Sequence, residues 1–484
     1  MTAVTDNYTI VVDETGRRYR VGESPHSLTG HSRSWMVWLP WIAMMGISVF
    51  EYGYGAAAKT LQQVNGWSLS QAFWIVTIWA VFQAGIAFPA GRLREKNVFS
   101  ARAAMLTGAV FTAIGFLTIA NTGNIPVVLL GYSVVGGIGA GLVYATCINM
   151  VGKWFPEKKG ARTGFVNGGF AYGAVPFIYI FSYFFTPKTF TPVLTAIAVY
   201  MFVVLFACAI FFKDPPKDWW PAEVDPREWK KDSKAKAVRS LRKNPPAAGQ
   251  FGPLDAIKTG MLPLLWLGLL IIATVSLFGS AYQIPFAKQA GFGTLIAATS
   301  GGVLSVVNGA GRAAVGWFSD LVGRKQALFY VMVVEGLSQF GLLLSGNAHN
   351  QAFFLLSAVL AGVGGGAFFP MYAAITTDYF GENNNASNYG LVYSAKLASA
   401  IVGIGLGASL ISGLGFTKAY IIGGIVSFVG AAVVLTYRQP GRQHDHAMSS
   451  DGVEELPAMK ATAPSVAGGK QKYATDRRGL GETP

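Results

Sequence analysis

The chain has 484 residues, of which 52% are hydrophobic and only 13% are charged. Soluble proteins carry about twice that charged fraction, ~25%, so this composition excludes an ordinary soluble multidomain protein. The 38 Lys and Arg outnumber the 24 Asp and Glu, and the net charge of +14 raises the question of nucleic acid or an anionic membrane surface as the partner. The positions of these cations along the chain decide that question.

Long apolar runs follow one another between residues 35 and 437, and each has about the ~20 residues that a helix needs to cross the hydrocarbon layer of a bilayer. Only helices and closed barrels can span lipid, and the runs lack the alternation of barrel strands. We therefore predict an all-α membrane protein with twelve transmembrane helices. The predicted helices are Trp35–Ala57, Leu69–Ala90, Ala101–Asn121, Ile125–Met150, Thr163–Phe185, Phe190–Phe212, Met261–Ile284, Thr294–Phe318, Gln326–Ser345, Gln351–Thr377, Ala386–Ile411 and Phe416–Tyr437.

Three polar segments delimit two six-helix bundles. Residues 1–34 and 438–484 are predicted to be tails, and residues 213–260 a cytoplasmic linker between an N-terminal bundle, 35–212, and a C-terminal bundle, 261–437. Similar segments recur at the same place in the fourth helix of each bundle, GIGAGLVY in the first and GVGGGAFF in the second. Two pseudo-symmetric halves that arose by internal duplication are therefore expected.

The cations are distributed very unevenly between the two sides of the predicted membrane. Thirty-two Lys and Arg lie in the tails, the linker and the loops of one side, whereas the loops of the other side hold four, Lys59, Lys188, Lys288 and Lys418. Short cytoplasmic loops retain positive charge, so both termini are predicted to be cytoplasmic. The cations then mark topology in a cell membrane of the bacterial type, and the lipid bilayer rather than nucleic acid is the expected partner.

Two cations remain inside the apolar runs, Arg312 in the eighth predicted helix and Lys396 in the eleventh. A cation near the bilayer centre costs at least ~2.5 kcal/mol, so both are expected to face a polar cavity in which an anion offsets their burial. Arg presents a planar fork that matches a carboxylate, and Lys adds a point charge, which indicates a site for a small mono- or dicarboxylate. The alternative is that both cations pair internally with Glu51 or Glu335.

Glu51 and Glu335 are the acids that lie deep in the predicted helices. Burial disfavours the charged form of a carboxylate unless a cation lies beside it, so either residue is a candidate proton site during transport. Glu51 stands among tyrosines and glycines, a setting typical of a cavity. For both acids, a structural hydrogen bond between helices is the alternative.

The segment GWFSDLVGRKQAL lies at the predicted turn between the eighth and ninth helices. It resembles the loop signature of the major facilitator superfamily, in which this loop acts as a conformational latch. The latch residues that the resemblance implies are Gly316, Asp320, Gly323, Arg324 and Lys325. The corresponding segment of the first half, GRLREKNVFSAR, departs from the signature because Arg94 and Glu95 stand at its acidic position.

Within that superfamily, three segments resemble the oxalate:formate antiporter family. They are NGAGRAAVGWFSDLVGR from residue 308, NYGLVYSAKLASA from residue 388 and KWFPEKKGARTG from residue 153. Matched by position, Arg312 and Lys396 correspond to the two substrate-binding cations of that family. Related proton-coupled monocarboxylate transporters bear an acid one turn before this arginine, where the present chain has Asn308.

Aromatic residues are expected to shape the cavity, because Tyr combines an apolar wall with a polar group. In this superfamily the first, fourth, tenth and eleventh helices line the pathway. On these helices the candidate substrate-binding residues are Tyr54, Tyr144, Phe368, Tyr372 and Tyr393. Ordinary helix packing is the alternative for each of them.

We therefore expect a secondary active transporter of a small organic anion such as oxalate or formate, which works by alternating access and anion exchange. A proton-coupled lactate or pyruvate carrier is the alternative within this class, and a non-transporting membrane sensor is the alternative outside it. The sequence contains no nucleotide-binding motif, metal-ligand spacing or nucleophile and base pair, so neither an enzyme nor a cofactor is expected. We expect the protein to be a monomer.

Overall fold

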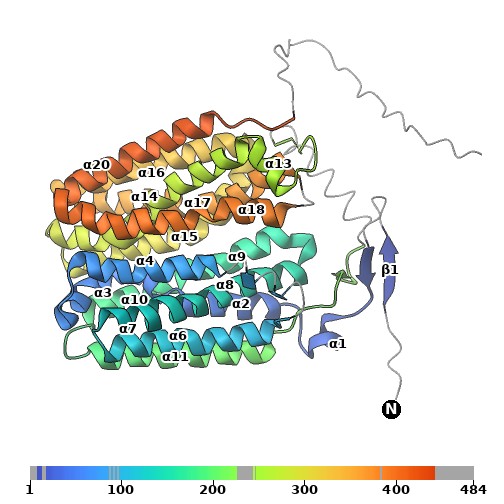
Figure 1. Cartoon of the computed structure of the whole chain (residues 1–484), viewed down its shortest axis with the longest axis horizontal. Coiled ribbons are helices and arrows are strands. Elements are labelled where there is room, and N and C mark those ends of the chain that lie inside the picture. Colours follow the sequence, from blue (N-terminus) through green and yellow to red (C-terminus); the bar gives the residue numbers. More distant parts are fainter. Residues whose placement is uncertain are drawn as a thin grey trace, which may run out of the picture. The chain divides into compact units, whose positions relative to one another are not determined.

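The computed structural model describes residues 8–12, 18–86, 89–90, 93–94, 98–225, 244–245, 247–381 and 384–441. Within these ranges the chain forms two bundles of helices, one from each half of the sequence (Figure 1). The short helix α1 (Pro25–Thr29) and the strand β1 (Thr9–Val12) lie at the end of the N-terminal bundle that the charge pattern predicts to be cytoplasmic, and α13 (Pro253–Lys258) lies at the same end of the C-terminal bundle.

In the described chain the N-terminal bundle contains six helical segments and the C-terminal bundle five, the last of which turns sharply at Gly415; several are built from consecutive helices. The N-terminal bundle comprises α2 (Trp35–Ile47) with α3 (Val49–Asn65), α4 (Leu69–Gly85), α6 (Ala101–Asn121), α7 (Ile125–Val128) with a π-helical segment (Leu129–Gly136) and α8 (Gly137–Trp154), α9 (Lys159–Tyr172) with α10 (Ala174–Tyr183), and α11 (Phe190–Phe211). The C-terminal bundle comprises α14 (Met261–Gln289), α15 (Thr294–Val322), α16 (Arg324–Asn347), α17 (Gln351–Phe380), and then α18 (Asn385–Tyr393), α19 (Ala395–Ala400), a second π-helical segment (Ile401–Leu406) and α20 (Gly407–Leu435).

By length and apolar composition, ten helices of the described chain could cross a membrane. The expected number is twelve, and the difference has two physical causes. α4 has 17 residues and is shorter than the other spans. The last two predicted helices run together in α20, where Gly415 (φ 76°) turns the chain sharply because glycine tolerates a positive φ. With these two features included, each of the twelve predicted apolar runs coincides with a helical segment.

Helices pack closely at the glycine-rich part of the fourth predicted helix. A Cβ atom on Gly139 would lie 2.8 Å from the backbone nitrogen of Thr112 on α6, and one on Gly115 would lie 3.0 Å from the Cα atom of Gly136. Small residues let helix backbones approach one another in this way inside a membrane. A larger side chain at either position would push α6 away from its neighbour.

The two bundles are in close contact at the end that the charge pattern predicts to face the outside. α3 approaches α14 so closely that a Cβ atom on Gly55 would collide with a backbone carbonyl of α14. The ring of Trp74 on α4 covers Gly405, and the ring centres of Phe73 and Tyr282 lie 4.3 Å apart. Backbone contact and aromatic packing therefore seal this end.

At the opposite, predicted cytoplasmic end, a cavity of about 420 Å³ lies between α9 and α15. Lys158, Arg162 and Tyr172 line it from the N-terminal bundle, and Gly309 and Ala313 line it from the C-terminal bundle. The two halves are thus tightly apposed on the outer side, and on the other side a cavity lies beside the contact that α9 and α15 make at Gly168 and Gly309.

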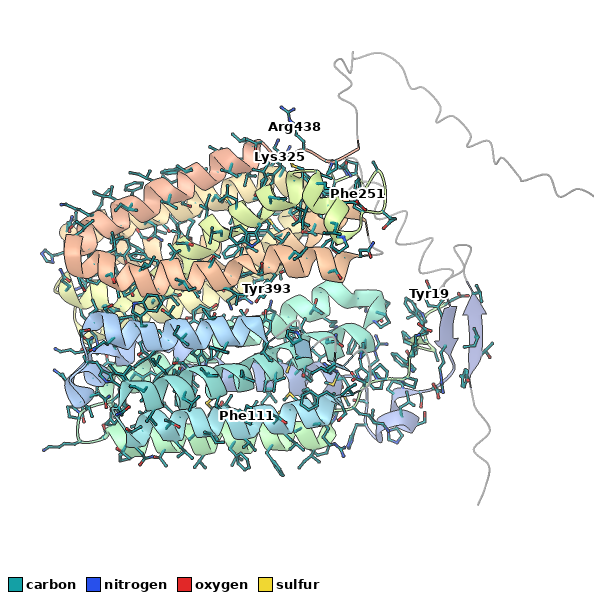
Figure 2. The ribbon with its side chains drawn as sticks, in the orientation of Figure 1. Tyr19, Phe111, Phe251, Lys325, Tyr393 and Arg438 are labelled. Carbon is teal, nitrogen blue, oxygen red and sulfur yellow. The ribbon has the colours of Figure 1, made fainter. Side chains whose placement is uncertain are left out.

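Part of the predicted N-terminal tail is ordered. β1 (Thr9–Val12) pairs antiparallel with β2 (Arg18–Val21), and β2 pairs in parallel with β3 (Trp219–Trp220) from the beginning of the predicted linker. Tyr19, labelled in Figure 2, packs edge-on against the second tryptophan of β3, with ring centres 5.0 Å apart. The first tryptophan of β3 packs against Trp154 at the end of α8 (4.9 Å). This small sheet therefore joins the tail and the linker to the N-terminal bundle.

The end of the predicted linker contacts the C-terminal bundle. α13 (Pro253–Lys258) directly precedes α14, and the backbone nitrogen of Phe251 donates a hydrogen bond to the carbonyl oxygen of Phe380 (2.9 Å; Figure 2 labels Phe251). The side-chain oxygen of Asn244 accepts a hydrogen bond from the backbone nitrogen of Arg324 (2.6 Å). The described parts of the linker are therefore anchored at both ends, each to its own bundle.

A buried ion pair holds the N-terminal bundle together at its predicted cytoplasmic end. Arg94 is 3% exposed and donates to both carboxylate oxygens of Asp214, at 2.8 and 2.7 Å, and Lys153 lies 3.5 Å from the same carboxylate. One guanidinium nitrogen, Nη2, makes both contacts, and hydrogen bonds between charged groups are stronger than those between neutral ones. The first half therefore has a cation, Arg94, where the latch signature has an acid. The acidic partner of Arg94 is Asp214, which follows α11.

Replacing Asp214 with Ala should lower the thermal unfolding midpoint of the purified protein in detergent. The buried guanidinium of Arg94 would lose its counter-charge, which costs about 2–3 kcal/mol after allowance for the partial exposure of Asp214. The matched control is Glu223→Ala, because the Glu223 side chain is 69% exposed and lies 3.8 Å from Arg33. Equal midpoints for the Asp214→Ala variant and the control would contradict the importance of the pair.

Candidate functional site

A small cavity lies between the two bundles, at the first turn of α3 and roughly midway along α14. Its volume is about 20 Å³, enough for about one water molecule. Tyr393, one of its lining residues, is labelled between the bundles in Figure 2. The lining residues come from both bundles and are Glu51, Tyr52, Tyr144, Phe170, Ser276, Leu277, Ser280, Arg312, Gly365, Phe369, Tyr393 and Lys396.

Arg312 extends from α15 into the contact between the bundles and is 5% exposed. One guanidinium nitrogen donates to the side-chain oxygen of Asn167 on α9 (2.5 Å). The other donates to the side-chain oxygen of Asn308, one turn earlier on α15 (3.1 Å), and to the hydroxyl of Tyr52 on α3 (3.3 Å). All of these acceptors are neutral. Within the described chain, Arg312 forms no ion pair.

Lys396 on α19 is 3% exposed and also contacts the N-terminal bundle. Its ammonium lies 3.3 Å from a carboxylate oxygen of Glu51 on α3 and donates to the side-chain oxygen of Gln83 on α4 (3.2 Å). The ring centres of Phe170 and Phe369 lie 5.9 and 5.8 Å from the ammonium. The internal pairing considered from the sequence is therefore present for Lys396 with Glu51 and is not seen for Arg312.

Glu335 does not line this cavity. It lies on α16, is 1% exposed, and accepts a hydrogen bond from the amide of Gln339, one turn later (3.1 Å). Its side chain packs against Gly364 on α17. The structure therefore separates the two acids that the sequence grouped as candidate proton sites: Glu51 lies beside Lys396 in the cavity that Arg312 also lines, whereas Glu335 lies among helices of the C-terminal bundle.

Two of the five candidate aromatic residues line the cavity. They are Tyr144, whose hydroxyl donates to the side-chain oxygen of Asn167 (3.1 Å), and Tyr393. The other three lie in helix packing. Tyr54 donates to the carbonyl oxygen of Ala72, Tyr372 forms a hydrogen bond with Tyr437 (3.0 Å), and Phe368 belongs to the apolar core of the C-terminal bundle.

Several residues of the site have no signal in the sequence alone. Tyr52 and Phe369 line the cavity, whereas Tyr54 and Phe368, which the sequence favoured, point into apolar packing. Successive positions on a helix differ by about 100°, so neighbouring aromatic residues face different surroundings. Gln83 contacts Lys396 from a helix outside the four that the family resemblance selected. Hydropathy does not distinguish these positions, because the helices are apolar on most sides.

Arg324 and Asp320 of the predicted latch lie together at the predicted cytoplasmic end of α15. The guanidinium of Arg324 contacts the carboxylate of Asp320 (2.5 Å) and that of Asp378 on α17 (3.5 Å). Gly323 has a φ of 106°, which favours glycine, and it separates α15 from α16. Asp378 lies on another helix, α17, and is therefore not part of the sequence motif.

The motif does not imply the surroundings of two further predicted latch residues, Gly316 and Lys325. Apart from the backbone of its own helix, no atom of the described residues lies within 4 Å of the position of a Cβ on Gly316, so close approach of a neighbour does not require glycine in this conformation. Lys325 donates to the carbonyl oxygen of Tyr437 after α20 (3.0 Å), and Figure 2 labels it at the end of the C-terminal bundle. The motif thus joins α15, α16, α17 and the segment after α20.

A family model described as the Major Facilitator Superfamily matches residues 40–394 and 314–467. The chain is 23% identical over 392 residues to the oxalate:formate antiporter of Oxalobacter formigenes, a match that covers 81% of this chain and 88% of the relative. It is 25% identical over 370 residues to an uncharacterized MFS-type transporter, YhjX, of Escherichia coli strain K12, covering 73% and 84%. A shorter match, 28% over 155 residues, covers 30% of this chain and 25% of apicoplast pyruvate carrier 1 of Toxoplasma gondii.

Solved structures with the same fold include other transporters. A POT family transporter in complex with 5-aminolevulinic acid has a TM-score of 0.62 at 16% identity and covers 85% of this chain and 97% of its own. A D-xylose-proton symporter has a TM-score of 0.61 at 15% identity and covers 82% and 96%. The predicted all-α membrane fold is thereby confirmed. Together with the family model, which matches most of the sequence, this shows that the chain belongs to the major facilitator superfamily.

Proposed function

We propose that the protein is a secondary active transporter that exchanges small organic anions across a cell membrane by alternating access. Its substrate is a carboxylate such as oxalate or formate, bound between the bundles at Arg312 and beside the Lys396–Glu51 pair, and its termini face the cytoplasm. The distribution of Lys and Arg supports this orientation. The similarity to the oxalate:formate antiporter of Oxalobacter formigenes supports this substrate class.

The environment of Arg312 carries the proposal. Its guanidinium is buried, all of its hydrogen-bond acceptors are neutral, and its Nε atom has no partner within the described structure. A cation held in this way keeps its charge in a region of low dielectric, which is costly unless an anion binds beside it. A carboxylate supplies two oxygens in the plane of the guanidinium, a geometry that a single neutral ligand does not offer.

The composition of the cavity supports alternating access. Tyr144 and Phe170 line it from the N-terminal bundle, and Phe369 and Tyr393 line it from the C-terminal bundle. A ligand at this point contacts both halves. Rocking of the bundles about the ligand would open the outer end and close the inner end. The aromatic side chains from both halves would enclose a small anion at this point.

A proton-coupled monocarboxylate carrier is the second candidate, because one observation favours it. The cavity contains a carboxylate, that of Glu51, which lies 3.3 Å from Lys396, and proton symport requires a titratable group in the substrate pathway. The similarity of part of the chain to a pyruvate carrier of Toxoplasma gondii agrees with a monocarboxylate substrate.

Replacing Arg312 with Gln should reduce the uptake of labelled carboxylate into proteoliposomes by about tenfold to a hundredfold. This is the effect of losing a charged hydrogen bond worth ~1.5–3 kcal/mol. Arg312→Lys retains the charge but loses the planar fork, so its uptake should lie between those of the wild type and Arg312→Gln. Lys418→Gln, which removes an exposed cation at the predicted outer end, is the matched control. Unchanged uptake by a well-inserted Arg312→Gln protein would refute the anion site.

A counterflow measurement separates exchange from proton symport. Proteoliposomes loaded with unlabelled formate should accumulate labelled formate rapidly, whereas empty proteoliposomes should not do so when the outside is made acidic. Strict exchange requires an internal anion, and a proton gradient cannot replace it. Accumulation driven by the proton gradient alone would contradict exchange and establish the second candidate.

A further inference from the structure

The cavity between the bundles contains an uneven set of charges. Of the residues that line it, three are charged: the cations Arg312 and Lys396 and the acid Glu51. The other side chains that contact the two cations through hydrogen bonds are the neutral amides of Asn167, Asn308 and Gln83 and the hydroxyl of Tyr52. Two cations and one carboxylate leave the site with one net positive charge.

The carboxylate of Glu51 is tied to one cation only. It lies 3.3 Å from the ammonium of Lys396, and both side chains are nearly inaccessible, at 6% and 4% exposure. Arg312 contacts no acid within the described chain. The carboxylate of Glu51 therefore balances the charge of Lys396. The charge of Arg312 has no counter-charge in the described chain, so an anionic ligand would neutralise it.

Polar atoms beside the Glu51–Lys396 pair remain unsatisfied. The second carboxylate oxygen of Glu51 and the amide nitrogen of Gln83 are buried without a hydrogen-bond partner in the described structure. Buried polar atoms that lack partners are unfavourable and are uncommon outside functional sites. The amide nitrogen of Gln83 is a donor, so it adds a hydrogen bond for an anionic ligand without adding charge.

We propose that Glu51 is a charge-matching residue, which makes the site selective for carboxylates with one negative charge over dicarboxylates. This inference rests on the proposed transport function and narrows its substrate class. A monocarboxylate bound to Arg312 makes the cavity neutral. A dicarboxylate leaves a net negative charge in a region of low dielectric and places it near the carboxylate of Glu51, which repels it.

The location of Glu51 relative to the two cations indicates which substitution would change the anion selectivity. The residue lies on α3, while Arg312 and Lys396 lie on α15 and α19 of the other half, so all three side chains meet only where the bundles meet. Removing the charge of Glu51 while keeping its size should therefore release Lys396 to bind a second carboxylate group. Glu51→Gln makes this change.

The test compares anion preference in counterflow at neutral pH for formate, lactate and pyruvate against oxalate and malonate. The wild type should prefer the monocarboxylates. Glu51→Gln should shift the ratio of dicarboxylate to monocarboxylate transport by about tenfold or more, the change that ~1.4 kcal/mol produces. Glu51→Asp, the matched control, retains the charge and should retain the wild-type preference. In the double variant Glu51→Gln with Lys396→Gln, the site again has one positive charge, and the preference for monocarboxylates should return.

Binding is measured separately, as the rise in thermal unfolding midpoint that each of the five anions produces in the purified protein. This measurement also gives the anion preference of a variant that binds anions but no longer completes the transport cycle. An unchanged ratio in Glu51→Gln, or equal preference for both classes in the wild type, would overturn the role of Glu51 while leaving carboxylate transport intact. A wild type that neither binds nor transports any of the five anions would overturn the proposed function itself.

Discussion

Burial of positive charge midway through the helices is the constraint on which the rest of the structure depends. Arg312 lies well inside α15, and Lys396 lies inside the run of consecutive helices from α18 to α20, so each needs polar partners inside the protein. The partners come largely from the opposite half: Asn167 and Tyr52 for the arginine, and Glu51 and Gln83 for the lysine. The two bundles are thus joined at their centre by polar contacts, and a ligand that changes these contacts acts on both halves at once.

Apolar packing around this centre determines which way the site is closed. On the predicted outer side, Gly55 and Gly405 admit a backbone and an aromatic ring from the other bundle, so the two halves are in close contact there. On the other side, α9 and α15 pack together at Gly168 and Gly309, and a cavity lies beside this contact. The polar centre therefore lies between a close contact on the predicted outer side and a helix contact with a cavity beside it on the other side.

The segments at the predicted cytoplasmic end are more ordered than their polarity suggests. Tryptophan and tyrosine side chains give the N-terminal tail and the beginning of the linker an apolar surface, which they bury in a small sheet against α8. Backbone hydrogen bonds then tie the end of the linker to α17 and α16. These contacts hold each end of the linker to its own bundle. The residues of the central site lie on the helices, which determine its geometry.

The sequence by itself determined the features that follow from transfer to lipid: the all-α fold, the order of the twelve apolar segments and the two cations whose burial is costly. These are properties of residue type and spacing, which need no knowledge of neighbours. Only the tertiary structure decided that Lys396 pairs with Glu51, that Arg312 has no acidic partner in the described chain, and that Tyr52 and Phe369 rather than Tyr54 and Phe368 line the cavity. The physical reason is that the sequence of a helix that is apolar on most sides does not show which side faces a given neighbour. In addition, contacts between distant helices depend on how the two bundles meet.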